Sequence, residues 1–462
     1  MHDSDIAAPP REGHFHRSIG LFSAIAINMT QMCGIGPFIT IPIMVATMGG
    51  PQAVIGWIAG AVLAMADGLV WAELGAAMPG SGGTYVYLRE AFQYRTGKLM
   101  PFLFIWTALL TIPLTMSTGI IGMVEYLEFF FPHLGWWPLH LVGLAATALV
   151  TWLLYRRIES VRAITIALWV IMLVSVIGVS AAGFSDFHPS FAFTYPDGAF
   201  GSQFFVGLGA GLIVGIYDYL GYNTTAYMGD ELRDPGRTMP GSILISVIAM
   251  MCVYLVLNVS VLGVVPWQQI AQSKSVASLV VEHSWGHLAA AGMTVLIIVT
   301  AFASVFAGLL GGSRVPFQAA HDKMFLSVFG KLHAKHGFPH VALLTMGAVT
   351  AIGTFFDLTE VINMLLTAAV VVQSIAQIAA LVVLRKRQPT LRRPYKQWLY
   401  PLPCVVALLG WIYVYVSASA MSLILSSAWL VAGLAVFAIW ARVNRSWPFA
   451  PVEIRETYLG ND

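Results

Sequence analysis

The sequence predicts an all-α protein that crosses a membrane about twelve times. Of its 462 residues, 58% are hydrophobic and only 10% are charged, and the mean hydropathy is +0.77. Soluble domains carry about 25% charged residues. The chain divides into about twelve apolar runs joined by short connections, and about 20 apolar residues cross a bilayer as a helix. This pattern leaves no room for a separate soluble domain.

The basic residues are distributed by topology. With the N-terminus in the cytoplasm and twelve crossings, all of the 24 Lys and Arg except Lys274 fall on the cytoplasmic side, while acidic residues dominate the outer loops. Adding or removing one span would destroy this segregation. We therefore expect a multi-pass protein of the plasma (inner) membrane, surrounded by the lipid bilayer, with both termini cytoplasmic. The net charge of +2 indicates no nucleic-acid partner.

The residue types and their spacing also argue against several kinds of site. The three cysteines, Cys33, Cys252 and Cys404, lie in apolar runs without metal-ligand spacing, so we expect no disulfide, no metal site and no cofactor. No predicted span combines a nucleophile with a base, and an enzyme is therefore not expected. The polar N-terminal tail lacks the charged-then-apolar pattern of a cleavable signal, so we expect the first helix to stay in the protein. A monomer or a loose homodimer is expected.

The first half of the chain is predicted to hold five spans. They are expected at about Ser18–Ala46, Pro51–Met78, Phe102–Tyr126, Pro138–Tyr155 and Ala163–Phe184. The first is interrupted at residues 33–38, where two glycines and Pro37 remove helix propensity and a backbone donor together, so we expect the helix to unwind there. The second carries Asp67 in its interior and Glu73 near its end. Pro113 is expected to kink the third span.

A polar loop leads to seven further spans. After a sixth span that begins at Phe204, they are expected at about Gly241–Val265, Leu288–Phe317, Val341–Phe356, Leu358–Leu384, Leu402–Leu425 and Ala428–Trp440. The sixth span places Asp218 where a membrane helix normally carries Leu or Val. A charge at that depth costs roughly 2.5 to 3.5 kcal/mol, so we expect a substrate to compensate it.

The first and sixth spans are the interrupted ones, and an odd number of crossings separates them, so they enter the membrane from opposite sides. Paired broken helices in corresponding positions indicate a secondary transporter of inverted-repeat type. Unwinding exposes backbone groups at mid-membrane, which is tolerable where they line a cavity. Free N–H groups at a helix N-terminus suit a carboxylate, and free carbonyls at a helix C-terminus suit an ammonium group or a cation.

The predicted organisation has six parts. They are a cytoplasmic tail (1–17), a first inverted repeat (18–184), an external loop (185–203), a second inverted repeat (204–384), a basic loop with the last two spans (385–445) and a cytoplasmic tail (446–462).

The two helix breaks and the two aspartates could each have a structural role instead of a functional one. Either glycine-rich break could be a simple kink, although the two together at this spacing favour a site. Asp218 could pair with a structural donor, and Asp67 could be protonated and bonded to a neighbouring helix. 

The roles of three tyrosines and of two acidic residues near the span ends are also undecided from the sequence. Tyr217, Tyr219 and Tyr222 could pack in the bundle, or they could enclose a cationic group beside Asp218. Glu73 and Glu231 lie near the cytoplasmic ends of their spans, where they could close an inner gate or remain solvated.

Four motifs in a fixed order carry a family resemblance. They are Cys33 to Phe38 in the first span; Ala72-Glu73-Leu74 followed by Pro79 to Leu88; Gly221-Tyr222-Asn223 through Gly229 to Pro240; and Ser313 to Phe317 with Asp322-Lys323. Through them the chain resembles the amino acid, polyamine and organocation superfamily over nearly its whole length. The glycine-proline-phenylalanine of the first span and the acid six positions before Glu73 are also similar to its polyamine uptake members.

The resemblance implies a LeuT-type five-plus-five inverted repeat with two extra C-terminal helices and alternating access around a central site. It implies that the first break supplies amides to a substrate carboxylate, that Tyr217 to Gly221 supply carbonyls to the amino group, and that Tyr217 forms an aromatic lid. The expected substrate-binding residues are Cys33, Gly34, Ile35, Gly36, Pro37, Tyr217, Asp218, Tyr219, Gly221 and Tyr222. The expected coupling or gating residues are Asp67, Asp218, Glu73 and Glu231.

Two departures from the family separate the hypotheses. Proton-coupled members often carry a lysine in the fifth span, whereas this span has none and Ser175 lies near the expected position. Asp67 and Asp218 occur where many neutral amino acid carriers have apolar or small residues. The sequence therefore predicts a transporter of amino acids or related amines, proton-coupled or exchanging, in which protonation of Asp218 could be the coupling event. The alternatives are a polyamine or organic cation transporter that uses both aspartates, and a transporter-like sensor without net transport.

Overall fold

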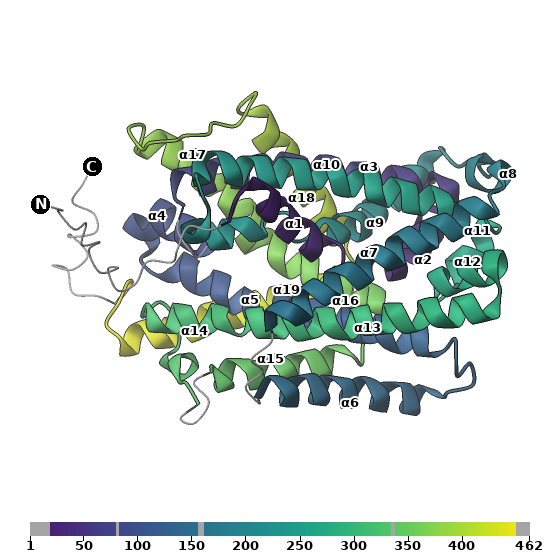
Figure 1. Ribbon diagram of the computed structural model, residues 1–462. Helices are drawn as coiled ribbons and strands as arrows, with labels where there is room; N and C mark the ends of the chain where they lie inside the picture. Colours follow the sequence, from purple (N-terminus) through teal and green to yellow (C-terminus); the bar gives the residue numbers. More distant parts are fainter. Residues whose placement is uncertain (1–18, 80–82, 156–160, 334–337, 450–462) are drawn as a thin grey trace, which may run out of the picture.

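The computed structural model describes residues 19–79, 83–155, 161–333 and 338–449 of the chain (Figure 1). The predicted N-terminal tail, the centre of the glycine-rich motif at 80–82, the basic turn at 156–160 and most of the C-terminal tail lie outside the described residues. Within them the structure is helical, with one isolated parallel bridge between Ile19 and Leu232.

The described residues contain eight helical segments long and apolar enough to cross a membrane, one bent helix pair that passes the same criteria together, and three shorter apolar helices. These segments correspond to the twelve predicted spans, and the predicted fold class is confirmed. The spans are built from α1 (Leu21–Met32), α2 (Gly36–Met48), α3 (Val54–Ala77), α5 (Leu99–Leu127), α6 (Trp136–Tyr155), α7 (Val161–Ser185), α9 (Ser202–Tyr219), α10 (Pro235–Leu262), α13 (His287–Gly312), α15 (His340–Gly353), α16 (Leu358–Ala369), α17 (Ala376–Arg387), α18 (Leu402–Ser417) and α19 (Ala420–Val443).

Short helices connect the spans. They are η1 (Pro51–Ala53), α4 (Thr84–Thr96), α8 (Pro189–Phe193), η2 (Thr224–Glu231), α11 (Trp267–Gln272), α12 (Val276–Trp285), α14 (Arg314–His321) and η3 (Ser327–Gly330). Of these, η2 is a 3-10 helix that continues the sixth span beyond its break.

The first span is broken where the sequence predicts. Helix α1 ends at Met32, α2 begins at Gly36, and the two axes differ by 52°. The N–H of Cys33 closes α1 by donating to the carbonyl of Met29, and Pro37 occupies the first turn of α2, where its missing N–H costs nothing. The sequence therefore sets both ends of this break.

The sixth span breaks slightly later than predicted. Tyr217 and Asp218 belong to the last turn of α9, and the chain leaves the helix at Leu220. Gly221 has φ of +112°, and a side-chain Cβ there would lie 2.7 Å from Cβ of Gln31. Only glycine combines this left-handed conformation with so close an approach. The break in α9 thus packs directly against the end of α1.

The two broken spans are also joined at their far ends. The N–H of Ile19 donates to the carbonyl of Glu231 at 3.0 Å, and the N–H of Arg233 donates to the carbonyl of Ile19 at 2.9 Å. This bridge connects the segment before α1 with the end of η2, so the start of the first span and the end of the sixth are held together.

The predicted boundary between the last two spans is wrong. The sequence suggested spans of Leu402–Leu425 and Ala428–Trp440, whereas α18 ends at Ser417 and α19 begins at Ala420. Ser419 is the N-cap of α19, and its hydroxyl accepts the N–H of Ser422. A serine cap inside a continuous apolar run stops one helix and starts the next.

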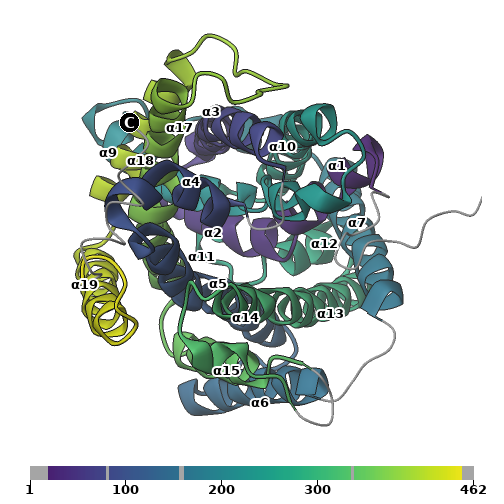
Figure 2. The ribbon, with the colours of Figure 1, turned by 90° about the vertical axis from the view of Figure 1, so that its left-hand side faces the viewer.

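Figure 2 views the bundle along its spans and shows α6, α15 and α19 at its margin, with α2 surrounded by other helices. Helix α3 packs against α9, α10 and α18, and α5 packs against α13, α15 and α16. In agreement, 61% of the most apolar stretch of α5 is buried, against 22% for α19. The second half of the first broken span, α2, therefore lies in the interior, where most of its residues are buried.

Candidate functional site

A cavity of about 150 Å³ lies where the two broken spans meet. Its wall comes from the break between α1 and α2, the last turn of α9, and the facing surfaces of α5, α7 and α13. The lining includes Cys33, Gly34, Ile35, Gly36, Tyr217 and Asp218 among the predicted binding residues. The structure thus brings the two predicted half-sites together around one space, which we call the central cavity.

Asp218 is the only carboxylate that lines the described part of the central cavity, and its side chain is 2% exposed. Oδ2 accepts a hydrogen bond from the Thr40 hydroxyl at 2.5 Å, while Oδ1 has no partner among the described residues. Oδ1 lies so close to Gly36 that a Cβ on that residue would be 2.2 Å away. The carboxylate therefore faces the N-terminal end of α2, which favours negative charge.

The break leaves backbone donors at the same place. Within the described residues, the N–H groups of Gly34 and Ile35 make no hydrogen bond to another backbone group. Unpaired amides at a helix N-terminus bind anions. Asp218 and any anionic group of a ligand would thus share one positively polarised helix end.

Tyr217 closes one side of the central cavity. Its hydroxyl and that of Thr118 in α5 are 2.6 Å apart, which fixes the ring between α9 and α5. The ring also borders the start of α2, because its Cε1 would lie 3.8 Å from a Cβ on Gly36. The geometry is compatible with the aromatic lid that the family resemblance implies.

Tyr254 of α10 contacts the backbone at both helix breaks. Its hydroxyl lies 2.8 Å from the carbonyl oxygen of Met32 and 2.8 Å from that of Asp218. Neither the sequence motifs nor the spacing singled out this residue, because one tyrosine in an apolar span has no distinctive pattern. One of the carbonyls expected to face an amino group, that of Asp218, is thus already in contact with a phenol.

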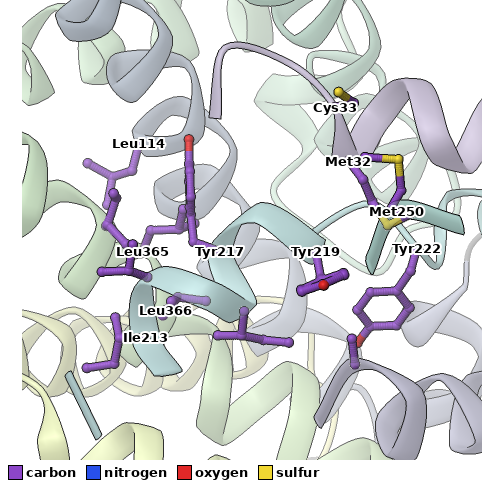
Figure 3. Packing of buried hydrophobic residues seen from close by; sticks show 14 of the residues in the cluster. Met32, Cys33, Leu114, Ile213, Tyr217, Tyr219, Tyr222, Met250, Leu365 and Leu366 are labelled. Carbon is purple, nitrogen blue, oxygen red and sulfur yellow. The ribbon is translucent and has the colours of Figure 1, made fainter. Parts of the chain in front are cut away.

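The other two tyrosines of the predicted enclosure point elsewhere, as Figure 3 shows. The Tyr219 hydroxyl donates to the carbonyl of Trp57 in α3 at 3.3 Å, and the Tyr222 hydroxyl donates to Asp67. Neither lines the central cavity. The three rings do not surround one group, because Tyr217 and Tyr219 lie about 200° apart around α9 and Tyr222 follows the turn at the end of that helix.

Asp67 lies in a different environment, at 1% exposure in α3. Besides Tyr222, the indole N–H groups of Trp71 and Trp411 donate to it, each at 3.1 Å. These residues belong to three different parts of the chain. Asp67 borders a second cavity, on the other side of the break in α9, and the structure therefore separates it from Asp218.

The two predicted gating acids differ as well. Glu73 is fully buried and receives two hydrogen bonds from Arg385, at 2.8 and 2.5 Å, and one from the N–H of Gln397 at 2.9 Å. Arg393 approaches it at 3.6 Å. Glu73 thus ties α3 to α17 and the segment after it. Among the described residues Glu231 makes no ion pair, and its backbone carbonyl forms the bridge to Ile19.

One further position bears on the predicted coupling. Ser175, near the position of the absent lysine, donates to the carbonyl of Ile171 in its own helix at 2.9 Å. No group of three or more His, Cys, Asp or Glu side chains within the described ranges is arranged to hold a metal ion.

A multi-pass helical bundle with two broken spans around a buried cavity defines a membrane transporter. The sequence matches the amino acid permease family over residues 19–447, and the chain belongs to that family. The expected resemblance to the amino acid, polyamine and organocation superfamily is confirmed, and the protein is a transporter and not an enzyme.

Relatives over most of the chain carry names of the same kind. The chain is 26% identical to the branched-chain amino acid permease of Bacillus subtilis (strain 168), with 95% of this chain and 96% of that protein covered. It is 29% identical to the Asc-type amino acid transporter 1 of Mus musculus (87% and 76% covered). It is 28% identical to the large neutral amino acids transporter small subunit 2 of Rattus norvegicus (87% and 75% covered).

Proposed function

We propose that the protein is a secondary active transporter that moves amino acids across the plasma membrane by alternating access, coupled to protons. The relatives named above are amino acid permeases and transporters. The lining of the central cavity includes both unpaired amides and one acidic side chain, which suits a ligand that carries an anionic and a cationic group. The observation that carries the proposal is the position of the Asp218 carboxylate at the N-terminal end of α2.

This position makes substrate and proton binding interdependent. The start of α2 is the natural binding point for the carboxylate of an amino acid, because of its free amides and the helix dipole. Asp218 Oδ1 already lies there, against Gly36. Two ionised carboxylates at one point repel each other. An amino acid therefore binds best when Asp218 carries a proton, and by reciprocity the proton binds best when the amino acid is present.

Protonation also changes what Asp218 offers to the ligand. A carboxyl group gains an O–H donor that can be directed at the substrate carboxylate, whereas the carboxylate only accepts. Thr40 holds Oδ2, so Oδ1 is the atom available for this role. In this scheme the proton and the amino acid enter and leave the central cavity together, and no lysine in α7 is required.

Uptake into proteoliposomes tests this proposal. With the more acidic solution on the side from which substrate enters, wild-type protein should accumulate radiolabelled leucine above its equilibrium level. Asp218→Asn should still exchange leucine but should no longer accumulate it in response to the pH gradient. Glu360→Gln is the matched control. Within the described part of the chain, Glu360 in α16 also accepts only from neutral hydroxyls, those of Ser419 and Ser422, and it lines neither cavity. Accumulation by Asp218→Asn at the wild-type level would refute the proposed coupling.

The unpartnered Oδ1 also favours a second candidate, the uptake of a polyamine or another organic cation. An ammonium group would neutralise Asp218 in place of a proton. Thermal unfolding of the purified protein with amino acids and with polyamines separates the candidates, because a saturating ligand raises stability by a few kcal/mol at about 100 times its dissociation constant. A transporter-like sensor would bind ligand in this assay but show no counterflow.

A further inference from the structure

The hydroxyl of Tyr254 lies between the two helix breaks. It is 2.8 Å from the carbonyl oxygen of Met32, the last residue of α1, and 2.8 Å from that of Asp218, in the last turn of α9. Both carbonyls belong to helix C-terminal ends, where the last carbonyl groups have no partner within the helix. One phenol thus provides a hydrogen-bonding contact at each break.

Packing fixes the position of this hydroxyl. Tyr254 is fully buried, and the centroid of its ring lies 5.1 Å from that of Trp57 in α3 and 5.3 Å from that of Tyr219 in α9. Its own helix, α10, is continuous from Pro235 to Leu262. Buried side chains in a close-packed interior have little freedom to move. Tyr254 therefore presents its hydroxyl to both breaks from a rigid support.

The hydroxyl of Tyr254 has one proton for two carbonyl oxygens. It can share that proton between them only while the two breaks keep their present separation. If the end of α1 moves away from the last turn of α9, the hydroxyl keeps one carbonyl and leaves the other unsatisfied. Because an unsatisfied buried acceptor is unfavourable, the hydroxyl opposes separation of the two breaks.

Asp218 is held from both halves of the first broken span. Its backbone carbonyl is connected through Tyr254 to the end of α1, whereas its carboxylate accepts the Thr40 hydroxyl of α2 at 2.5 Å. The axes of α1 and α2 differ by 52°. The place of the carboxylate at the start of α2 therefore depends on two contacts, one from each side of the break.

We propose that Tyr254 is a positioning residue for the coupling of proton binding to amino acid binding. By holding the backbone of Asp218 against the end of α1, it keeps Oδ1 beside Gly36. The amides of Gly34 and Ile35, which the proposed function assigns to the substrate carboxylate, lie at the same helix end. Without this restraint the carboxylate moves away, and the amino acid binds whether or not Asp218 carries a proton. The inference rests on the proposed function, because it takes Asp218 as the proton carrier.

Asp218 is the group whose protonation this restraint affects. The titratable groups that interact electrostatically with it are the thiol of Cys33 in the first break, the phenols of Tyr217 and Tyr219 in its own helix, and the phenol of Tyr254. Helices α5, α7 and α13 contribute no titratable side chain to the described lining of the central cavity. Thiols and phenols ordinarily lose their protons above about pH 8, so a dependence on more acidic pH reports on the carboxyl group.

The test compares Tyr254→Phe with Tyr126→Phe in the purified full-length protein. Each change removes only a hydroxyl. Tyr126 is an equally buried tyrosine of α5, but its hydroxyl donates to the carbonyl of Phe38, inside α2 and at neither break. Isothermal titration calorimetry of wild-type protein should give a Kd for leucine that is about fivefold or more lower at about pH 5.5 than at about pH 7.5, the usual size of a coupling between two sites. Tyr254→Phe should reduce this ratio to about twofold or less, and Tyr126→Phe should preserve it.

Transport in proteoliposomes gives a second readout. Leucine counterflow by Tyr254→Phe should stay within about fivefold of wild type, roughly the effect of one hydrogen bond. The number of protons taken up per leucine should fall about twofold or more, because the two ligands no longer bind to one point. Tyr254→Phe combined with Asp218→Asn should behave as Asp218→Asn alone, since changes that remove the same interaction are not additive.

The outcomes separate the role of Tyr254 from the proposed function. If the affinity of wild-type protein for leucine is independent of pH, coupling through Asp218 is refuted and the role of Tyr254 with it. If wild-type protein responds to pH and Tyr254→Phe responds equally, only the role of Tyr254 is refuted. Loss of leucine counterflow in Tyr254→Phe, or an equal loss of the pH response in Tyr126→Phe, would assign the hydroxyl to folding alone and overturn the inference.

Discussion

Asp67 and Asp218 are two buried acids in membrane-spanning helices, but their surroundings differ in kind. Among the described residues, Asp67 receives hydrogen bonds from three side chains, whereas Asp218 receives one and its Oδ1 has no partner. The donors of Asp67 come from α3, α18 and the segment after α9, so this acid holds helices together. The role of a charged residue in an apolar span is therefore ambiguous until its hydrogen-bond donors are known.

We expect the largest effect on the free energy of unfolding when each aspartate is replaced by leucine. Asp67→Leu should lower the free energy of unfolding by about 3 kcal/mol or more, because three buried donors lose their acceptor and each costs about 1 to 3 kcal/mol. Asp218→Leu should change it by about 1 kcal/mol or less, since Thr40 also donates to the carbonyl of Gly36 and keeps that partner. Thermal unfolding of both purified variants measures the difference. If Asp218→Leu were the less stable variant, Asp67 would not be the acid with the larger structural role.

Gly36→Ala probes the contact between α2 and Asp218. The new Cβ would lie 2.2 Å from Oδ1, so the carboxylate or the helix must move. We expect a loss of about 1 to 3 kcal/mol, the usual cost of overpacking, together with loss of leucine uptake. Adding Asp218→Ala should restore the lost stability. If the double variant unfolds as early as Gly36→Ala alone, the contact is not the cause.

The smallest expected effect concerns Tyr217. Tyr217→Phe removes the hydroxyl that contacts Thr118 but keeps the ring at the cavity wall. A single hydrogen bond contributes about 1 kcal/mol, so we expect roughly a fivefold higher KM for leucine and little change in maximal rate. Thr118→Val, which removes the same contact from α5, should match it. A much larger loss in only one of the two variants would show that the hydroxyl has another partner during transport.

The sequence predicted the frame of the fold because its signals are local. Two glycines and Pro37 define the first break, and the position of the sixth span follows from apolar length and from Asp218. The end of the eleventh span was not predictable from hydropathy, because Ser419 caps a helix inside an uninterrupted apolar run. Apolarity marks membrane depth but does not mark a helix terminus.

The site was predictable only where its residues carry local sequence signals. The motifs named the residues of both breaks, but the separation of Asp67 from Asp218 depends on Trp411, which lies 344 residues further along the chain from Asp67. Thr40 and Tyr254 were missed because a hydroxyl in an apolar span usually bonds to its own helix, and nothing local indicates a partner across the bundle. Long-range donors set the surroundings of the two aspartates.

We propose that Asp218 carries the coupling proton. A measurement of proton flux tests this role most directly. A pH-sensitive dye inside proteoliposomes, with no imposed pH gradient, should report acidification of the lumen when leucine is added outside to wild-type protein. We predict that Asp218→Asn takes up leucine down its concentration gradient without any acidification, while Glu360→Gln acidifies the lumen as wild type does. Acidification by Asp218→Asn at the wild-type ratio of protons to leucine would contradict it.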